Sequence, residues 1–154
     1  MTVARIEDFA PPAPYRAVTA FDVIEHLLDP RVLLERARTW LQPGGALALT
    51  LPDIGSAAAR LLGKWWYFYA PLDHFHYWDR HTISRFLTRN GFRVERVARA
   101  TKPLTIGYVA RQLGVFYGPL GTPARLLLRL PGGVRDRPIP IPVGEMLVVA
   151  RHDG

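Results

Sequence analysis

The feature that most constrains this chain is a helical repeat between two short apolar runs. Residues 15–21 (YRAVTAF) and 46–51 (ALALTL) have the composition of strands buried on both faces of a parallel sheet. Between them, an Asp-Pro pair at 29–30 predicts a helix N-cap followed by proline in the first turn. Apolar residues then recur at helical spacing until residues 42–45 (QPGG). The order strand, helix, strand predicts a right-handed βαβ unit and an α/β fold.

Two more helices and two more strands are expected downstream. We expect a short helix over 56–62 and a longer helix that Asp79 caps and that ends at residues 90–91 (Asn-Gly). Residues 92–100 and 145–151 are the remaining strand candidates.

Length and composition limit the class of protein. A chain of 154 residues with 49% apolar and 21% charged residues predicts a single globular domain. The absence of cysteine excludes disulfides, thiol catalysis and cysteine-based zinc sites. The apolar stretches are shorter than the roughly 18–20 residues of a membrane span, and Glu7 and Asp8 lie where a signal peptide would be apolar. We therefore expect a cytoplasmic protein.

The positive charge is concentrated in one region. Of 20 basic residues only two are lysine, and residues 101–142 hold six basic residues against Asp136 alone, within a net charge of +7. This region contains two apolar segments, 104–117 and 124–130, and resembles an insertion. Basic residues on apolar segments suit an interfacial helix at an anionic bilayer, and the alternative is a lid with solvated arginines. Nucleic-acid binding is not expected, because the charge follows no recognisable motif.

Polar side chains follow the first predicted strand directly. Residues 21–27 (FDVIEHL) lie between that strand and the capped helix. They are therefore placed at the carboxyl end of a parallel sheet, where ligands bind in α/β proteins. The alternative is that Glu25 is a turn carboxylate and His26 a solvated imidazole.

A second candidate region is aromatic. Eight of the fourteen residues in 65–78 are Trp, Tyr or Phe. His74 and His76 would lie on one side of an extended strand, and a metal site with Asp73, Asp79 or His81 is an alternative. Because a His-x-His pair alone is a weak signal, we predict no metal here. Ordinary packing of these aromatic residues over the sheet is a further alternative.

Four stretches resemble the class I S-adenosylmethionine-dependent methyltransferases, particularly the ubiquinone-biosynthesis-like branch of small-molecule methyltransferases. They are similar to the end of the family's fourth strand, the turn into its fifth strand, an aromatic-histidine segment with the helix after it, and the closing strand. In this chain the four stretches are 22–30 (DVIEHLLDP), 41–47 (LQPGGAL), 74–78 (HFHYW) with 82–92, and 144–150 (GEMLVVA). The resemblance covers residues 15–100 and 143–151.

The resemblance implies a Rossmann-like sheet of which this chain holds one part. The family's domain has seven strands, and a glycine-rich loop after the first strand holds much of the cofactor. This chain contains no Gly-x-Gly, and only 14 residues precede its first predicted strand. We therefore expect a partial methyltransferase domain over 1–154, with strands 4 to 7 present, strands 1 to 3 absent and a basic apolar insertion at 101–142.

The resemblance also implies a reaction and its residues. The implied reaction is methyl transfer from S-adenosylmethionine to a small-molecule or lipid-like acceptor, incomplete in this chain. Three residues would lie beside the cofactor, one would act as general base and four would line the acceptor pocket: Ala20, Phe21 and Asp22; His26; and His74, His76, Tyr77 and Trp78. A histidine, with an ordinary pKa of about 6.5, suits proton removal near neutral pH.

Two alternatives concern partners. The chain could be a non-catalytic module, derived from a methyltransferase, that binds a membrane or another protein. Self-association or a completing partner chain is also consistent with a domain that lacks its first three strands.

Overall fold

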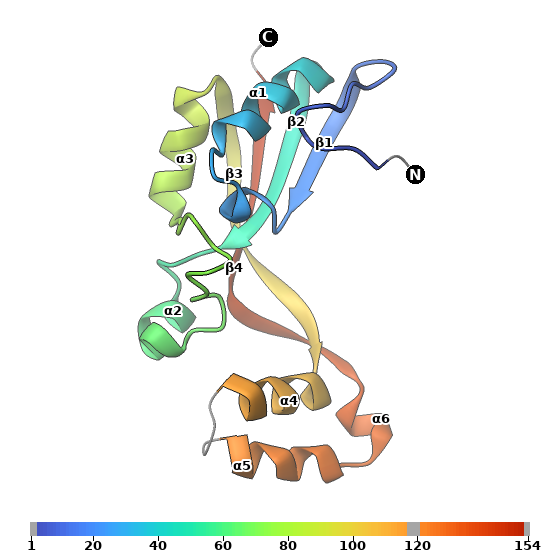
Figure 1. Ribbon diagram of the computed structural model, residues 1–154, viewed down its shortest axis with the longest axis vertical. Coiled ribbons are helices and arrows are strands. Elements are labelled where there is room, and N and C mark those ends of the chain that lie inside the picture. The colour runs from blue at the N-terminus through green and yellow to red at the C-terminus, as the bar shows by residue number, and fades with distance from the viewer. Residues whose placement is uncertain (1–2, 117–120, 153–154) are drawn as a thin grey trace. The chain divides into compact units, whose positions relative to one another are not determined.

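The computed structural model describes residues 3–116 and 121–152. The chain divides into two compact units (Figure 1). The first unit comprises Met1–Ala100 and Gly144–Gly154, and the second comprises Thr101–Val143.

The first unit contains a four-stranded sheet with its helices. Its elements, in chain order, are β1 (Tyr15–Phe21), the 3-10 turn η1 (Ile24–His26), α1 (Arg31–Trp40), β2 (Leu41–Pro52), α2 (Ala57–Leu62), the 3-10 turn η2 (Gly63–Trp65), α3 (Arg80–Arg89), β3 (Phe92–Thr105) and β4 (Pro138–His152). Strands β3 and β4 also extend into the second unit.

The strands are arranged in the order β1-β2-β4-β3. Strand β1 is parallel to β2, with Ala20 paired with Leu49, and β4 is antiparallel to β2, with Val148 also paired with Leu49. The predicted α/β class and the parallel pairing of the first two strands are therefore confirmed. The late strand β4 lies between β2 and β3, so the sheet is mixed.

The helix caps differ in how closely they follow the prediction. Helix α1 begins at Arg31, so Pro30 is the N-cap and not the first helical residue. Asp29 still accepts the exposed N–H of Arg31, at 3.0 Å, which is the bond that the sequence led us to expect of a cap. Helix α3 has the predicted cap: Asp79 accepts from the Thr82 N–H, and the Thr82 hydroxyl accepts from the Asp79 N–H.

Three strands are longer than predicted. Strand β2 begins at Leu41 and includes the QPGG segment that the sequence predicts as a turn. The register between β1 and β2 shifts here: Tyr15 pairs with Leu41 and Ala17 pairs with Ala46, so residues 42–45 form a bulge within the strand. Strands β3 and β4 extend to Thr105 and back to Pro138.

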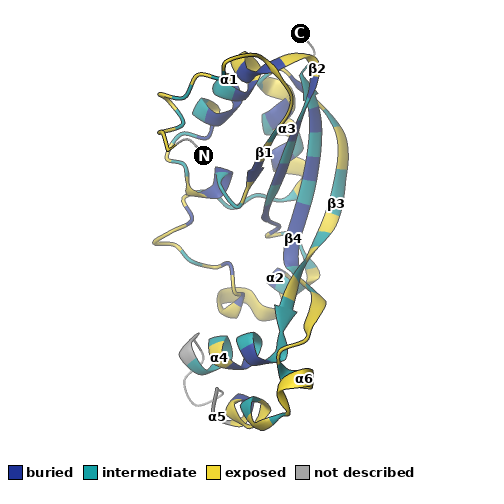
Figure 2. Cartoon of the chain, turned by 90° about the vertical axis from the view of Figure 1, so that its right-hand side faces the viewer, coloured by how far each residue is buried: buried dark blue, intermediate teal, exposed yellow. Residues whose placement is uncertain are grey.

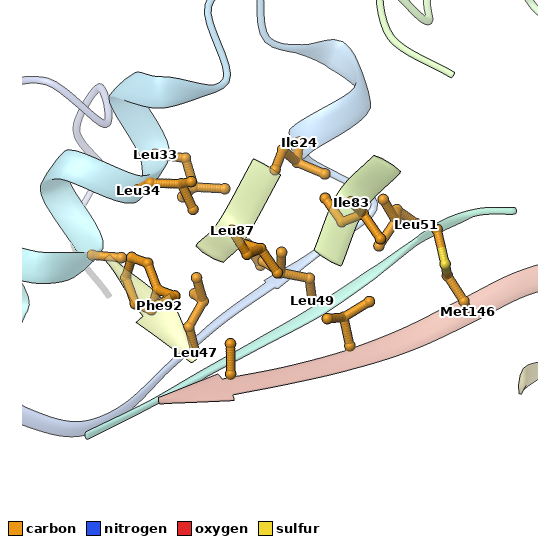
Figure 3. Packing of buried hydrophobic residues seen from close by; sticks show 14 of the residues in the cluster. Ile24, Leu33, Leu34, Leu47, Leu49, Leu51, Ile83, Leu87, Phe92 and Met146 are labelled. Carbon is orange, nitrogen blue, oxygen red and sulfur yellow. The ribbon is translucent and has the colours of Figure 1, made fainter. Parts of the chain in front are cut away.

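The core lies on one face of the sheet. Alternate residues of β2 (Leu47, Leu49 and Leu51) are fully buried, as are Leu34 of α1 and Leu87 of α3. Figure 3 shows these side chains packed between the helices and the strands. Because alternate side chains of a strand point to one face, α1 and α3 cover the same face of the sheet, as Figure 2 also shows.

The other face of the sheet is much less covered. The intervening residues of β2 and β4, Ala48, Thr50, Leu147 and Val149, are only partly buried, and most of β1 is exposed. The prediction that residues 15–21 are buried on both faces is therefore wrong. Strand β1 is an edge strand, and among its residues only Ala20 is buried.

The second unit is a set of short helices. They are α4 (Ile106–Phe116), α5 (Gly121–Ala124), the 3-10 turn η4 (Arg125–Arg129) and α6 (Gly132–Arg135). The apolar segment 104–117 forms the end of β3 and then α4, and its last residue, Tyr117, lies outside the described residues. Within the described part of the chain, no helix is long and apolar enough to cross a membrane.

Candidate functional site

The site begins where β1 ends. Asp22 follows the strand with a φ of 53°, and its N–H donates to the carbonyl of Thr50 on β2 at 2.9 Å. Aspartate adopts this left-handed conformation more readily than most residues do. The chain then turns into η1, which buries Glu25 and leaves His26 exposed.

A second segment, distant in sequence, is fastened to η1. The backbone carbonyl of Glu25 accepts hydrogen bonds from the N–H groups of Phe75 at 2.9 Å and His76 at 3.3 Å. These bonds place His74 beside His26, with 4.7 Å between ring centroids and an interplanar angle of 71°. The two histidine-bearing regions identified in the sequence therefore meet at one site.

Both imidazoles are oriented by backbone carbonyls. Nδ1 of His26 lies 2.8 Å from the carbonyl oxygen of Asp73, and Nδ1 of His74 lies 2.8 Å from that of Phe68. A carbonyl can only accept, so Nδ1 is the donor in each ring. In the neutral form, Nε2 of each ring therefore carries the free lone pair.

The two histidines differ in their surroundings. His74 is buried, and this desolvation lowers its pKa, with a smaller lowering from the neighbouring His26. His74 is thus held neutral near pH 7. Glu25 is also buried, with 1% of its surface exposed. Side-chain ligand atoms of Glu25, His26 and His74 all lie within 4.8 Å of one another.

The other predicted acceptor residues lie farther along the same segment. Nε2 of His76 lies 3.3 Å from the carbonyl oxygen of Leu28, and its ring is 5.7 Å from that of Trp78. Trp78 packs on Phe86 of α3, at 5.0 Å, beside the core. Burial raises the pKa of Tyr77, so its phenol stays protonated near neutral pH. Trp78 is therefore held in place by packing against α3 and the core.

The predicted cofactor-side residues form a short stretch at the carboxyl end of β1. Ala20 is buried, whereas Phe21 is 57% exposed. A shallow hollow of about 320 Å³, lined by residues 9–14 and by Arg36, Thr39 and Trp40, includes none of the predicted site residues.

Three buried carboxylates, those of Glu25, Asp53 and Glu145, were not among the predicted site residues. A turn carboxylate was one of two interpretations that the sequence left open for Glu25, which precedes His26 directly. Asp53 follows β2 at its carboxyl end, where its side chain accepts from the Gly55 N–H and lies 3.3 Å from Nε of Arg80. An acidic residue directly after a predicted parallel strand was the signal that could have identified Asp53.

A known family matches most of this architecture. The family model described as "Methyltransferase domain" matches residues 2–97, which is more than half of the chain. The chain therefore belongs to the methyltransferase domain family, and the predicted resemblance is confirmed. The ubiquinone-biosynthesis-like branch stays a prediction. None of the curated proteins matches this sequence.

Solved structures share the fold at low sequence identity. A Bacillus halodurans protein assigned as a methyltransferase is 16% identical with a TM-score of 0.61, covering 98% of this chain and 70% of its own. A second protein assigned as a methyltransferase, from Haloferax volcanii, was solved in complex with the Trm112 methyltransferase activator. It is 15% identical with a TM-score of 0.60, and the match covers 99% of this chain and 61% of that protein. A Thermotoga maritima SAM-dependent methyltransferase is 13% identical with a TM-score of 0.54, covering 97% and 62%. This chain thus spans about two thirds of their lengths.

Proposed function

We propose that this chain forms the acceptor-side part of an S-adenosylmethionine-dependent methyltransferase that acts on a small-molecule or lipid-like acceptor. The observation that carries the proposal is the sheet, in which β1 is parallel and β4 antiparallel to β2, in a chain whose residues 2–97 match the family. We assign β1 to β4 to the fourth to seventh strands of the family's seven-stranded fold.

The exposure of the sheet supports a need for completion. Strand β1 lies at the edge, and the face opposite the core presents apolar residues such as Phe21, Leu147 and Val149. Unpaired edges and apolar faces favour association with another chain segment. In the family, the first strand pairs with the fourth. We propose that three further strands, from a partner chain or another part of the protein, cover this edge and face.

His26 is the proposed general base. The cofactor, when bound, supplies the methyl group on a sulfonium centre. The carbonyl of Asp73 holds the Nδ1–H of His26, so Nε2 can accept a proton from the acceptor. Burial lowers the pKa of the adjacent His74, so that ring stays neutral beside His26 near pH 7. Ala20, Phe21 and Asp22 are the proposed cofactor-side residues.

The segment after the aromatic block is the proposed acceptor wall. His76, Tyr77 and Trp78 are half-buried and follow directly from His74. Their aromatic rings, with a protonated phenol at Tyr77, suit an acceptor that has both an apolar body and a polar group.

Calorimetric titration of S-adenosylhomocysteine tests this proposal. The purified chain alone should give no heat, whereas the chain co-purified with the product of an upstream reading frame should bind at about micromolar affinity, worth about 8 kcal/mol. His26→Ala in the completed protein should keep this binding and lose methyl transfer, while His81→Ala should keep both. Micromolar binding by the chain alone would refute the need for completion. A completed protein that binds no S-adenosylhomocysteine would refute the proposed methyltransferase activity.

A second candidate function, contact with an anionic membrane, is favoured by the surface of the second unit. Leu126 and Leu127 are exposed, by 60% and 39%, between the exposed Arg125 and Arg129. Apolar side chains flanked by arginines suit the interface of an anionic bilayer, and such contact would bring a lipid-like acceptor to the enzyme.

Co-sedimentation with vesicles tests the membrane proposal. The full chain should co-sediment with vesicles that contain phosphatidylserine. It should stay in solution when the vesicles contain phosphatidylcholine alone. The double variants Leu126→Ser/Leu127→Ser and Arg125→Gln/Arg129→Gln should each weaken binding. The matched control is Leu61→Ser/Leu62→Ser, which alters two exposed leucines of α2. Equal binding by all variants would argue against this surface.

A further inference from the structure

We propose that Glu25, His26 and His74 bind one divalent transition-metal ion of the Zn²⁺ type. Each of these residues offers one ligand atom, and the three atoms lie within 4.8 Å of one another. Two come from η1 and one from the segment fastened to it by the hydrogen bonds to the Glu25 carbonyl. This set differs from the one that sequence spacing suggested, because it lacks His76, Asp79 and His81.

The orientation of both rings supports metal binding. Each Nδ1 is engaged by a backbone carbonyl at 2.8 Å, which leaves Nε2 as the ligand atom. Histidines that bind metals commonly donate their other N–H to a carbonyl or carboxylate, and this fixes the ring in place. Here both histidines of the group have that arrangement.

Burial and charge support the same assignment. Glu25 and His74 are 1% and 9% exposed, whereas His26 lies at the surface, so a cation can enter from the His26 side. A buried carboxylate is stabilised by a cation bound close to it. Tetrahedral zinc holds its nitrogen and oxygen ligands about 3.4 Å apart, given bonds of about 2.0–2.1 Å. Binding therefore requires the ligand atoms, which lie within 4.8 Å of one another, to approach by up to about 1.4 Å, and the buried carboxylate of Glu25 and the two rings would share this adjustment.

The ligand set indicates the class of metal. Two imidazole nitrogens and one carboxylate favour zinc-like ions over Mg²⁺ and Ca²⁺, which prefer oxygen ligands. Three protein ligands leave one tetrahedral position for an oxygen donor. Resting on the proposed function, that donor is an acceptor oxygen. In the metal-bound protein Nε2 of His26 is a ligand, so the role of general base proposed above applies to the metal-free protein.

Calorimetric titration of ZnCl₂ into the metal-stripped chain tests the proposal without any measurement of activity. The wild-type chain should bind one ion. Glu25→Gln and His74→Gln should each weaken binding about tenfold or more, by loss of a ligand. His76→Ala and His81→Ala are the matched controls and should bind as the wild type does. MgCl₂ should give at least tenfold weaker binding.

The outcomes are distinct from those of the cofactor titration. Absence of stoichiometric zinc binding by the wild-type chain, with circular dichroism showing that it is folded, would overturn the proposal. Unchanged binding by folded Glu25→Gln and His74→Gln variants would also overturn it. Loss of binding in His76→Ala or His81→Ala, with Glu25→Gln unaffected, would assign the metal to the other histidines and refute this site. None of these results depends on S-adenosylhomocysteine binding.

Discussion

The imidazole rings of His26 and His74 meet edge to face, with 4.7 Å between their centroids. One ring is exposed and the other is buried, and each is held at Nδ1 by a different backbone carbonyl. The pair thus combines a histidine that solvent and ligands can reach with one that the fold keeps neutral. This relationship makes the site sensitive to pH.

Acidification should destabilise the protein through His74. Burial lowers its pKa below the ordinary 6.5, so the unfolded chain binds the proton more tightly. The stabilising contribution is therefore complete above about pH 6.5 and is lost as the pH falls towards the lower, folded pKa. Thermal unfolding in EDTA should show Tm falling between pH 7 and pH 5, and falling less in His74→Gln. His81→Ala, at an exposed position, should retain the full decrease. An equal decrease in all three proteins would contradict the assignment to His74.

Gly144→Ala should destabilise the first unit strongly. Gly144 has a φ of 90°, and an added Cβ would lie 2.5 Å from Ser56 Oγ and 2.9 Å from Trp66 Nε1. We expect a loss of about 3 kcal/mol, from the left-handed backbone and the overpacking together. Gly44 has a φ of 72°, but a Cβ added there would meet nothing within 4 Å. Gly44→Ala should therefore lower the free energy of unfolding by only about 1–2 kcal/mol, from the left-handed backbone alone. Urea unfolding followed by tryptophan fluorescence measures both losses, and equal values would show that steric contact adds nothing at Gly144.

The two faces of the sheet should respond differently to truncation of a leucine. Leu49 is fully buried on the face covered by α1 and α3, whereas Leu147 is half-buried on the opposite face. Leu49→Ala should cost about 2–5 kcal/mol, and Leu147→Ala about 1 kcal/mol or less. Urea unfolding of the two variants measures these costs. A similar loss of stability in both variants would mean that the face carrying Leu147 is also covered in solution, for example by self-association.

Asp79→Ala should weaken helix α3. The Asp79 carboxylate accepts the Thr82 N–H at 2.7 Å, and this bond lowers the pKa of Asp79. Removal of such a cap costs about 0.5–2 kcal/mol, and Asp79→Asn, which keeps an oxygen acceptor, should cost less. Because the folded pKa is lowered, the carboxylate stabilises the fold above pH 3.8 and less as the pH falls below it. Chemical unfolding at pH 7 orders the three proteins, and an Asp79→Asn variant as unstable as Asp79→Ala would point to charge and not to the hydrogen bond.

Local features of the sequence predicted the elements that depend on neighbouring residues. The helical spacing between two apolar runs predicted α1 between β1 and β2, and Asp79 with Asn90-Gly91 predicted both ends of α3. These features depend on interactions within a few residues, so periodicity and capping chemistry are enough to identify them.

Predictions of burial were less successful. The apolar composition of β1 led us to expect burial on both faces, and most of the strand is exposed at the edge of the sheet. Composition reports what a strand can bury, whereas its actual exposure depends on which other segments cover it. The same distinction explains Glu25, whose burial results from the chain packed against η1.

The sequence by itself therefore determined the α/β class, the βαβ order, the cap of α3 and the resemblance to methyltransferases. Only the tertiary structure decided that β4 lies between β2 and β3, that one face of the sheet holds the core, and that His26 meets His74 beside Glu25. The physical reason is the range of the interactions. Caps and periodicity follow from contacts between near neighbours, whereas strand order and the meeting of His26 with His74 depend on hydrogen bonds and packing between residues far apart in the chain.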